Sequence, residues 1–167
     1  MGISLDIQNA SIDEMSSALA MLKDAARWLE KNNINQWKRW LDPDEKTLAW
    51  VRQGFDNNEF FLARLGGKLA GMFRLTWDKD RLWDDREARA GYLHAFTTDR
   101  KLKDNNIGSA MLEWMKEYCR QNDRQLLRLD CHSWSTPLRS YYEKHGFKFI
   151  TDKDSAYGQV SLYEKAL

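Results

Sequence analysis

The segment Tyr92-Leu-His-Ala-Phe-Thr-Thr-Asp-Arg-Lys-Leu-Lys-Asp-Asn-Asn-Ile-Gly-Ser-Ala-Met-Leu112 contains a strand pattern, a polar turn and the start of an amphipathic helix. Residues 88–98 predict a strand, and Ile107, Met111 and Trp114 recur at helical spacing. A helix that begins directly after a turn presents backbone N–H groups with no partner inside the helix, and such groups attract anions. The segment therefore predicts an anion-binding turn that ends at Gly108.

The composition indicates a single domain, residues 1–167, which is long enough to bury a hydrophobic core. A formal net charge of +1 argues against a nucleic-acid binder. No apolar run approaches the roughly 20 residues of a membrane helix, and the N-terminus lacks the pattern of a signal peptide. We therefore expect a cytoplasmic protein with no membrane partner. Cys119 and Cys131 lack metal-ligand spacing, so we expect free thiols and no metal.

Hydrophobic periodicity and turn residues predict the other elements. They are a strand at 3–7, a helix from Ser11 to residues 32–33, a helix from 43–44 to 53, a hairpin of 60–65 and 69–77, a charged loop at 78–87, a strand at 126–131, a helix from 135–136 to 146, and strands at 147–150 and 159–163. Ser11 and Glu14 form a capping-box pattern, Gly54 is expected to end the second helix, and Gly66-Gly67 is expected to turn the hairpin.

This order predicts an α/β (α+β) domain with a mixed, mostly antiparallel sheet. The crossover from strand 88–98 through the helix at Ile107 to strand 126–131 predicts one parallel pair of strands.

A second segment, Ser135-Thr-Pro-Leu-Arg-Ser-Tyr-Tyr-Glu-Lys-His-Gly-Phe147, follows in the right order to complement the first. Together the two segments resemble the GNAT superfamily of N-acetyltransferases. Lys103-Asp104-Asn105-Asn106-Ile107-Gly108 matches the family's loop Arg/Gln-x-x-Gly-x-Gly/Ala, and Tyr142 precedes Gly146-Phe147 as in the family's second motif. The resemblance implies a GNAT-like central sheet with helices on both faces.

The resemblance also implies acetyl-CoA as co-substrate, with its pyrophosphate held by backbone N–H groups of the loop. The implied cofactor-binding residues are Phe96, Thr97, Thr98, Lys103, Asn105, Asn106, Ile107, Gly108, Ser109 and Ser135. Asn106 stands where glycine is usual, and asparagine enters the left-handed region more readily than most residues, so we expect Asn106 to shape the turn. Asp104 brings a negative charge, which Arg100, Lys101 and Lys103 oppose.

Two catalytic residues follow from the resemblance. Tyr142 takes the position of the general acid, since a phenol with a pKa of about 10 carries its proton at neutral pH. His94 takes the position of a base that receives the proton of the amine through water. The alternatives are that Tyr141 and Tyr142 simply pack, and that His94 lies beside the sheet with one hydrogen bond. Asp130 is a rival base, or else pairs with Arg128 or Arg139.

The acceptor is less well defined by the sequence. Trp28, Trp37 and Trp40 form either an aromatic wall over the acceptor site or a packed cap on the sheet. The expected acceptor is a small-molecule amine or a protein amine, and the protein is expected to be a monomer or homodimer. The alternative function is a non-catalytic ligand-binding or regulatory domain with weakened coenzyme A binding. A nucleotide hydrolase is disfavoured because the chain lacks Gly-x-x-x-x-Gly-Lys-Ser/Thr.

Overall fold

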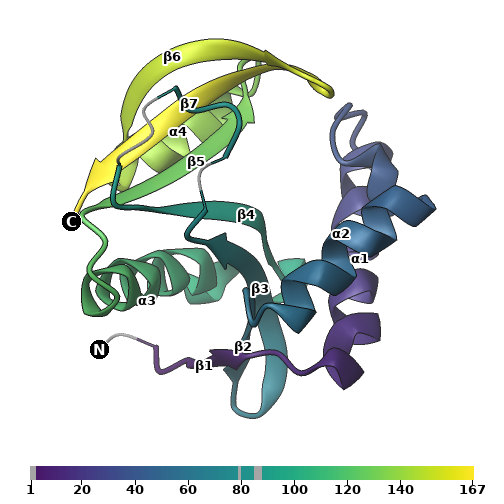
Figure 1. Cartoon of the computed structure of the whole chain (residues 1–167). Helices are drawn as coiled ribbons and strands as arrows, with labels where there is room; N and C mark the ends of the chain where they lie inside the picture. Colours follow the sequence, from purple (N-terminus) through teal and green to yellow (C-terminus); the bar gives the residue numbers. More distant parts are fainter. Residues whose placement is uncertain (1–2, 79, 85–87) are drawn as a thin grey trace. The chain divides into compact units, whose positions relative to one another are not determined.

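The structure, a computed structural model, describes residues 3–78, 80–84 and 88–167 (Figure 1). Its strands are β1 (Asp6–Asn9), β2 (Phe60–Leu65), β3 (Lys68–Thr76), β4 (Ala90–Thr98), β5 (Leu126–His132), β6 (Lys148–Ser155) and β7 (Gly158–Ala166). Its α-helices are α1 (Met15–Lys31), α2 (Glu45–Asp56), α3 (Ile107–Gln121) and α4 (Thr136–Lys144), and its 3-10 helices are η1 (Ile12–Glu14), η2 (Lys38–Trp40) and η3 (Arg100–Asn105).

The strands follow the order β1-β2-β3-β4-β5-β7-β6 in one sheet. The pairs β1–β2, β2–β3, β5–β7 and β6–β7 are antiparallel, whereas β4 and β5 run parallel. The expected α/β architecture with a mostly antiparallel sheet and one parallel crossover is therefore confirmed.

The chain divides into two compact units, which are described separately. Unit 1 comprises the described residues of Met1–Arg74 and Ala95–Met111, and unit 2 comprises those of Leu75–His94 and Leu112–Leu167. The elements β3, β4 and α3 each contribute residues to both units.

In unit 1, η1, which leads directly into α1, and α2 begin at the caps that the sequence indicates. The backbone N–H of Ser11 donates to the Glu14 carboxylate at 2.9 Å, and the Asp44 carboxylate accepts the N–H of Thr47 at 2.8 Å. Both helices bury their apolar faces against β2 and β3. The cluster comprises Ala10, Ala18, Leu22, Ala26, Trp40, Val51, Phe55, Phe60, Leu62 and Met72. Burial of this apolar stripe, rather than helix propensity, stabilises both helices.

The hairpin of β2 and β3 shows that helices cover both faces of the sheet within unit 1. Gly66 and Gly67 turn it with φ values of 57° and 79°, as a two-residue hairpin turn requires. Met72 belongs to the cluster with α1 and α2. Its neighbour Gly71 points the other way, where a Cβ atom would lie 2.5 Å from the sulfur of Met111 on α3.

In unit 2, the strands β5, β7 and β6 lie side by side (Figure 1). A Cβ atom at Gly91 of β4 would lie 2.8 Å from the Cys119 sulfur, so this face of the strand meets α3 closely. Tyr92 points to the opposite face and packs in a cluster with Trp83 and Leu162.

Several predicted boundaries were wrong. The first strand is Asp6–Asn9 rather than 3–7, and the last two strands extend well beyond 147–150 and 159–163. Gly54 does not end α2 but lies inside it. Glycine is required there because a side chain would collide with the Phe60 ring, with a Cβ atom only 2.6 Å from it. Residues 79 and 85–87 of the predicted charged loop lie outside the described residues.

Candidate active site

The turn from β4 to α3 is tied to the sheet of unit 1. The backbone N–H of Asp99 donates to the carbonyl of Ala70 on β3 at 2.8 Å. The Asp99 carboxylate in turn accepts the N–H of Lys101 at 2.9 Å and caps η3. These two bonds fix where the chain leaves the strand, so the start of α3 has a defined place.

Asn106 makes the turn into α3 in the left-handed conformation, with φ 51° and ψ 30°. Its carbonyl accepts the first helical bond of α3, from the N–H of Ala110 at 3.1 Å. The first N–H groups of α3, such as those of Ile107 and Gly108, lie ahead of this first hydrogen bond of the helix. They form the anion-binding end of a helix dipole. The expectation that asparagine can make the glycine turn is confirmed in its backbone conformation.

The predicted cofactor-binding residues of unit 1 occupy this turn and the end of β4. Lys103, Asn105 and Asn106 are exposed, while the side chain of Ile107 is buried and anchors the helix start. Phe96, Thr97 and Thr98 form the end of β4, where Thr97 is buried and its neighbours are half-buried. The predicted residues of this unit thus lie along one stretch of chain, from the end of β4 to the start of α3. The side chain of Asp104, which lies within that stretch, is not described.

Ala95 adopts a left-handed conformation, with φ 50°, in the interior of β4. Such a residue costs about 1–2 kcal/mol when it is not glycine, and it marks a bulge in a strand. The backbone therefore departs from a regular extended strand immediately before residues 96–98. These three residues are among the cofactor-binding residues that the family resemblance implies.

Arg100, one of the three cations expected to oppose the charge of Asp104, contacts an aromatic ring. Its guanidinium lies over the ring of Trp28 on α1, 3.4 Å from the ring centroid, in a cation–π contact. Trp40, by contrast, is 2% exposed and belongs to the core cluster. Of the two alternatives for these tryptophans, Trp40 therefore follows the packed one, whereas Trp28 is exposed.

In unit 2, Tyr142 lies on α4 and is buried among aromatic rings. Its ring is 5.7 Å from Phe147 and 6.4 Å from Tyr163 between centroids, and Tyr141 meets it edge-on. Burial raises the pKa of Tyr142 above its ordinary value, and Cys131, Tyr141 and Asp130 add to the rise. The phenol therefore keeps its proton throughout the neutral range, which a proton donor requires.

Other residues of the second motif have structural partners. Ser135 is buried at the N-cap position of α4, but its hydroxyl makes no capping bond. The Tyr163 hydroxyl donates to Glu143 at 2.7 Å and accepts from Arg139 at 3.1 Å. His145 follows the last residue of α4, and burial and the neighbouring Lys165 lower its pKa.

His94 occupies the same face of β4 as Tyr92 and is about one-fifth exposed. Its Nε2 lies 3.4 Å from the Thr76 hydroxyl and 3.9 Å from an Asp80 carboxylate oxygen. The sequence did not link residue 80 to residue 94, because Asp80 stands in a charged segment that resembles a solvated loop.

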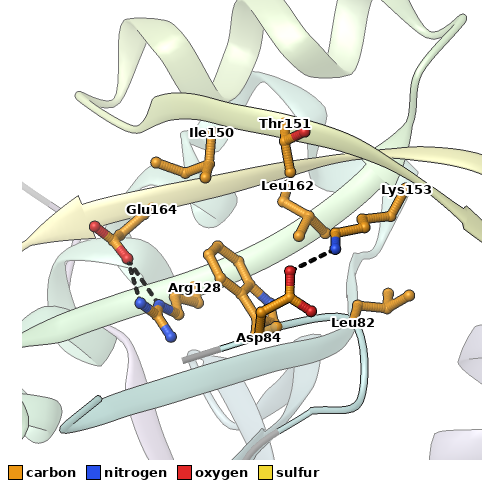
Figure 2. A pocket seen from close by; sticks show the side chains of 9 residues that line it. Leu82, Asp84, Arg128, Ile150, Thr151, Lys153, Leu162 and Glu164 are labelled. Carbon is orange, nitrogen blue, oxygen red and sulfur yellow. Dashed lines mark hydrogen bonds and ion pairs between the residues drawn. The ribbon is translucent and has the colours of Figure 1, made fainter. Parts of the chain in front are cut away.

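Arg128 and Glu164 form one end of a cavity of about 350 Å³ in unit 2 (Figure 2). Figure 2 shows the Glu164 carboxylate bound to Arg128, through contacts of 2.8 and 2.7 Å, and Lys153 bound to Asp84 at 2.6 Å. Arg128 therefore pairs with Glu164 on the neighbouring strand β7. No predicted site residue lines this cavity.

None of the helices in the described part of the chain has the length and hydrophobicity needed to span a bilayer. Within residues 3–78, 80–84 and 88–167, no group of three or more His, Cys, Asp or Glu side chains could hold a metal ion.

Comparison with known proteins identifies the family. The chain is 24% identical over 163 residues to the uncharacterized N-acetyltransferase YesJ of Bacillus subtilis, a match that covers 95% of this chain and 88% of the relative. A GNAT-family acetyltransferase structure from Listeria monocytogenes superposes with a TM-score of 0.83 at 23% identity, covering 99% of this chain and 96% of the other.

The N-acetyltransferase PaiA from Thermoplasma acidophilum, solved in complex with coenzyme A, superposes with a TM-score of 0.69 at 20% identity and covers 99% of this chain and 100% of its own. The family model described as acetyltransferase (GNAT) family matches residues 22–147, which include both motifs. The chain therefore belongs to the GNAT family of acetyltransferases and is an acyltransferase.

Proposed function

We propose that this chain transfers the acetyl group of acetyl-CoA to the primary amine of a small molecule. The observation that carries the proposal is the left-handed Asn106 turn, which sets the start of α3 so that the backbone N–H groups of Ile107 and Gly108 lie at a helix N-terminus, where a pyrophosphate can bind. The use of acetyl-CoA by the family and the coenzyme A complex of PaiA support this choice of donor. Lys103 and Asn105 are exposed beside the turn and suit the phosphates by charge and hydrogen bonding.

The reaction is a direct attack by a neutral amine on the thioester carbonyl. A C–N bond forms, and negative charge develops on the carbonyl oxygen, which backbone N–H groups of residues 96–98 stabilise. As the C–S bond breaks, Tyr142 gives its proton to the leaving sulfur. His94 receives the proton that the amine loses, through water. Ser135 and the threonines Thr97 and Thr98 complete the proposed cofactor contacts.

The acceptor side of the proposal is broader. We favour a small amine over a protein amine, in a single-domain protein of 1–167 that acts in the cytoplasm as a monomer or homodimer. Trp28 offers a partly exposed aromatic surface on α1, but Arg100 already covers one face of its ring.

A free-thiol release assay with acetyl-CoA tests the proposal against a panel of amines, peptides and amino acids, together with calorimetric titration of acetyl-CoA. Turnover with a small amine supports it, and turnover only with peptides would move the acceptor to proteins. Cofactor binding without turnover of any acceptor would favour the non-catalytic alternative. Absence of binding at millimolar acetyl-CoA would contradict the assignment of the α3 turn.

A further inference from the structure

Asp80 is held in place by its own turn at the start of the segment that follows β3. One carboxylate oxygen, Oδ1, accepts the N–H of Leu82 at 2.9 Å, and the Asp80 carbonyl accepts the N–H of Trp83 at 3.0 Å. The Trp83 ring is buried in the cluster of unit 2 and anchors the end of this turn. The second oxygen, Oδ2, faces His94.

His94 thus has two neighbours at the same ring nitrogen. Oδ2 of Asp80 lies 3.9 Å from Nε2, and the Thr76 hydroxyl lies 3.4 Å from it. The side chains of His94 and Asp80 are each about one-fifth exposed, so solvent screens their charge interaction less than it screens that of a surface pair. Since Nε2 is directed at these two groups, the ring orientation is defined from β3 and from the turn.

Several other charged groups lie on the described part of unit 2. Arg128 donates to the Tyr92 hydroxyl at 3.3 Å and pairs with Glu164. Asp130 follows Arg128 on the same face of β5. Asp84 pairs with Lys153 on β6. Asp80 lies at ion-pair distance from His94.

We propose that Asp80 is a positioning residue for His94: it fixes the imidazole ring and stabilises the imidazolium that forms when His94 accepts a proton. The inference rests on the proposed role of His94 as the base. The Asp80 turn orients one oxygen toward the ring while the other is occupied by the backbone, so the carboxylate is in place before the proton arrives. Preorganised charge of this kind needs no rearrangement during the reaction.

The test compares Asp80→Asn, His94→Gln and the double variant by the pH dependence of kcat/KM, with acetyl-CoA and the best amine of the panel. Asparagine keeps a side-chain oxygen for the N–H of Leu82, so the turn survives while the charge is removed. Asp78→Asn is the matched control, because Asp78 is exposed in the same segment.

We expect Asp80→Asn to lower kcat/KM about tenfold and to move its acidic limb to lower pH by about one unit, because an opposite charge favours protonated histidine. The double variant should be no worse than His94→Gln alone, since Asp80 acts through His94. Asp78→Asn should behave as the wild type. An unchanged limb in Asp80→Asn, or a loss that is uniform with pH, would overturn the role of Asp80. If the acidic limb of the pH profile of kcat/KM in His94→Gln stays where it is in the wild type, the role of His94 itself is overturned.

Discussion

Asn106 shows how a single backbone conformation links the sequence to a binding site. The left-handed region is disfavoured for residues with a Cβ atom, by about 1–2 kcal/mol, and asparagine enters it more readily than most. The Asn106 carbonyl also accepts the first hydrogen bond of α3. Asn106 thereby both turns the chain and sets the residue at which α3 begins, so that the N–H groups that follow lie at the N-terminus of the helix.

Substitution of Asn106 separates these effects. We expect Asn106→Gly to keep the fold and to tighten acetyl-CoA binding, because glycine allows closer approach of the backbone to phosphate. Asn106→Ala should lower the free energy of unfolding by about 1 kcal/mol and weaken binding, since alanine resists the observed φ of 51°. Chemical denaturation and calorimetric titration measure the two quantities. Weaker binding in Asn106→Gly would mean that the asparagine side chain itself contributes.

Tyr142 is the residue whose removal should affect chemistry most directly. Tyr142→Phe deletes only the hydroxyl, and we expect kcat to fall about 100-fold or more while the Kd for acetyl-CoA stays within about threefold. Tyr141→Phe is the matched control, because Tyr141 is its neighbour on α4 and its ring meets that of His145 at a tilt, with the centroids 4.6 Å apart. Equal kcat values for the two variants would remove Tyr142 from the role of proton donor.

At the scale of elements, α2 shows how packing overrides local propensity. Glycine ordinarily destabilises a helix interior by about 0.5–1 kcal/mol relative to alanine. Gly54 is nevertheless inside α2, since its missing side chain makes room for the Phe60 ring and for the guanidinium of Arg74. Arg74 is itself buried, pairs with Glu59 and lies over Trp50 at 4.2 Å. The glycine therefore serves the contact between α2 and the sheet of unit 1.

Gly54→Ala should therefore destabilise the protein, against the usual direction of this substitution in helices. The new Cβ atom would lie 2.6 Å from Phe60 and 2.8 Å from the Arg74 Nε, so neighbouring groups must shift. We expect a loss of about 1–3 kcal/mol in the free energy of unfolding. Gln53→Ala, at an exposed position of the same helix, should change it by less than about 0.5 kcal/mol in thermal or urea unfolding. A Gly54→Ala variant as stable as the wild type would show that α2 can move.

For the whole molecule, the two cysteines report on unfolding and on its pH dependence. Burial raises the pKa of Cys119 and of Cys131 to about 12 each, from an ordinary value near 9. Both thiols should resist alkylation in the native protein at pH 8 and react together when it unfolds.

The direction of the pH effect follows from the raised pKa values. The unfolded chain loses the thiol protons at lower pH than the folded protein, so stability is fully present below about pH 9 and falls as the pH rises toward 12. Cys119→Ala should flatten this fall when unfolding is followed by urea titration at several pH values. An equally steep fall in that variant would assign it to other groups.

Much of the architecture was accessible from the sequence because local signals agreed with the final packing. Gly66-Gly67, the Ser11 and Asp44 starts, and the apolar face of α3 each predicted the observed element. The predicted boundaries of elements were wrong where contacts between distant segments decided them. Nothing in the order of residues near Gly54 reveals that Phe60 and Arg74 approach it, and nothing near Asp80 reveals that it faces His94.

The sequence by itself determined the order of elements, the parallel crossover, the position of the α3 start and the family resemblance, because these depend on periodicity and on turn residues that are close in the chain. The tertiary structure alone decided that Ala95 is left-handed within β4, that Arg100 lies over Trp28, and that Asp80 faces His94. These features arise where segments far apart in the chain meet, and their energies depend on distances and burial that no local pattern encodes.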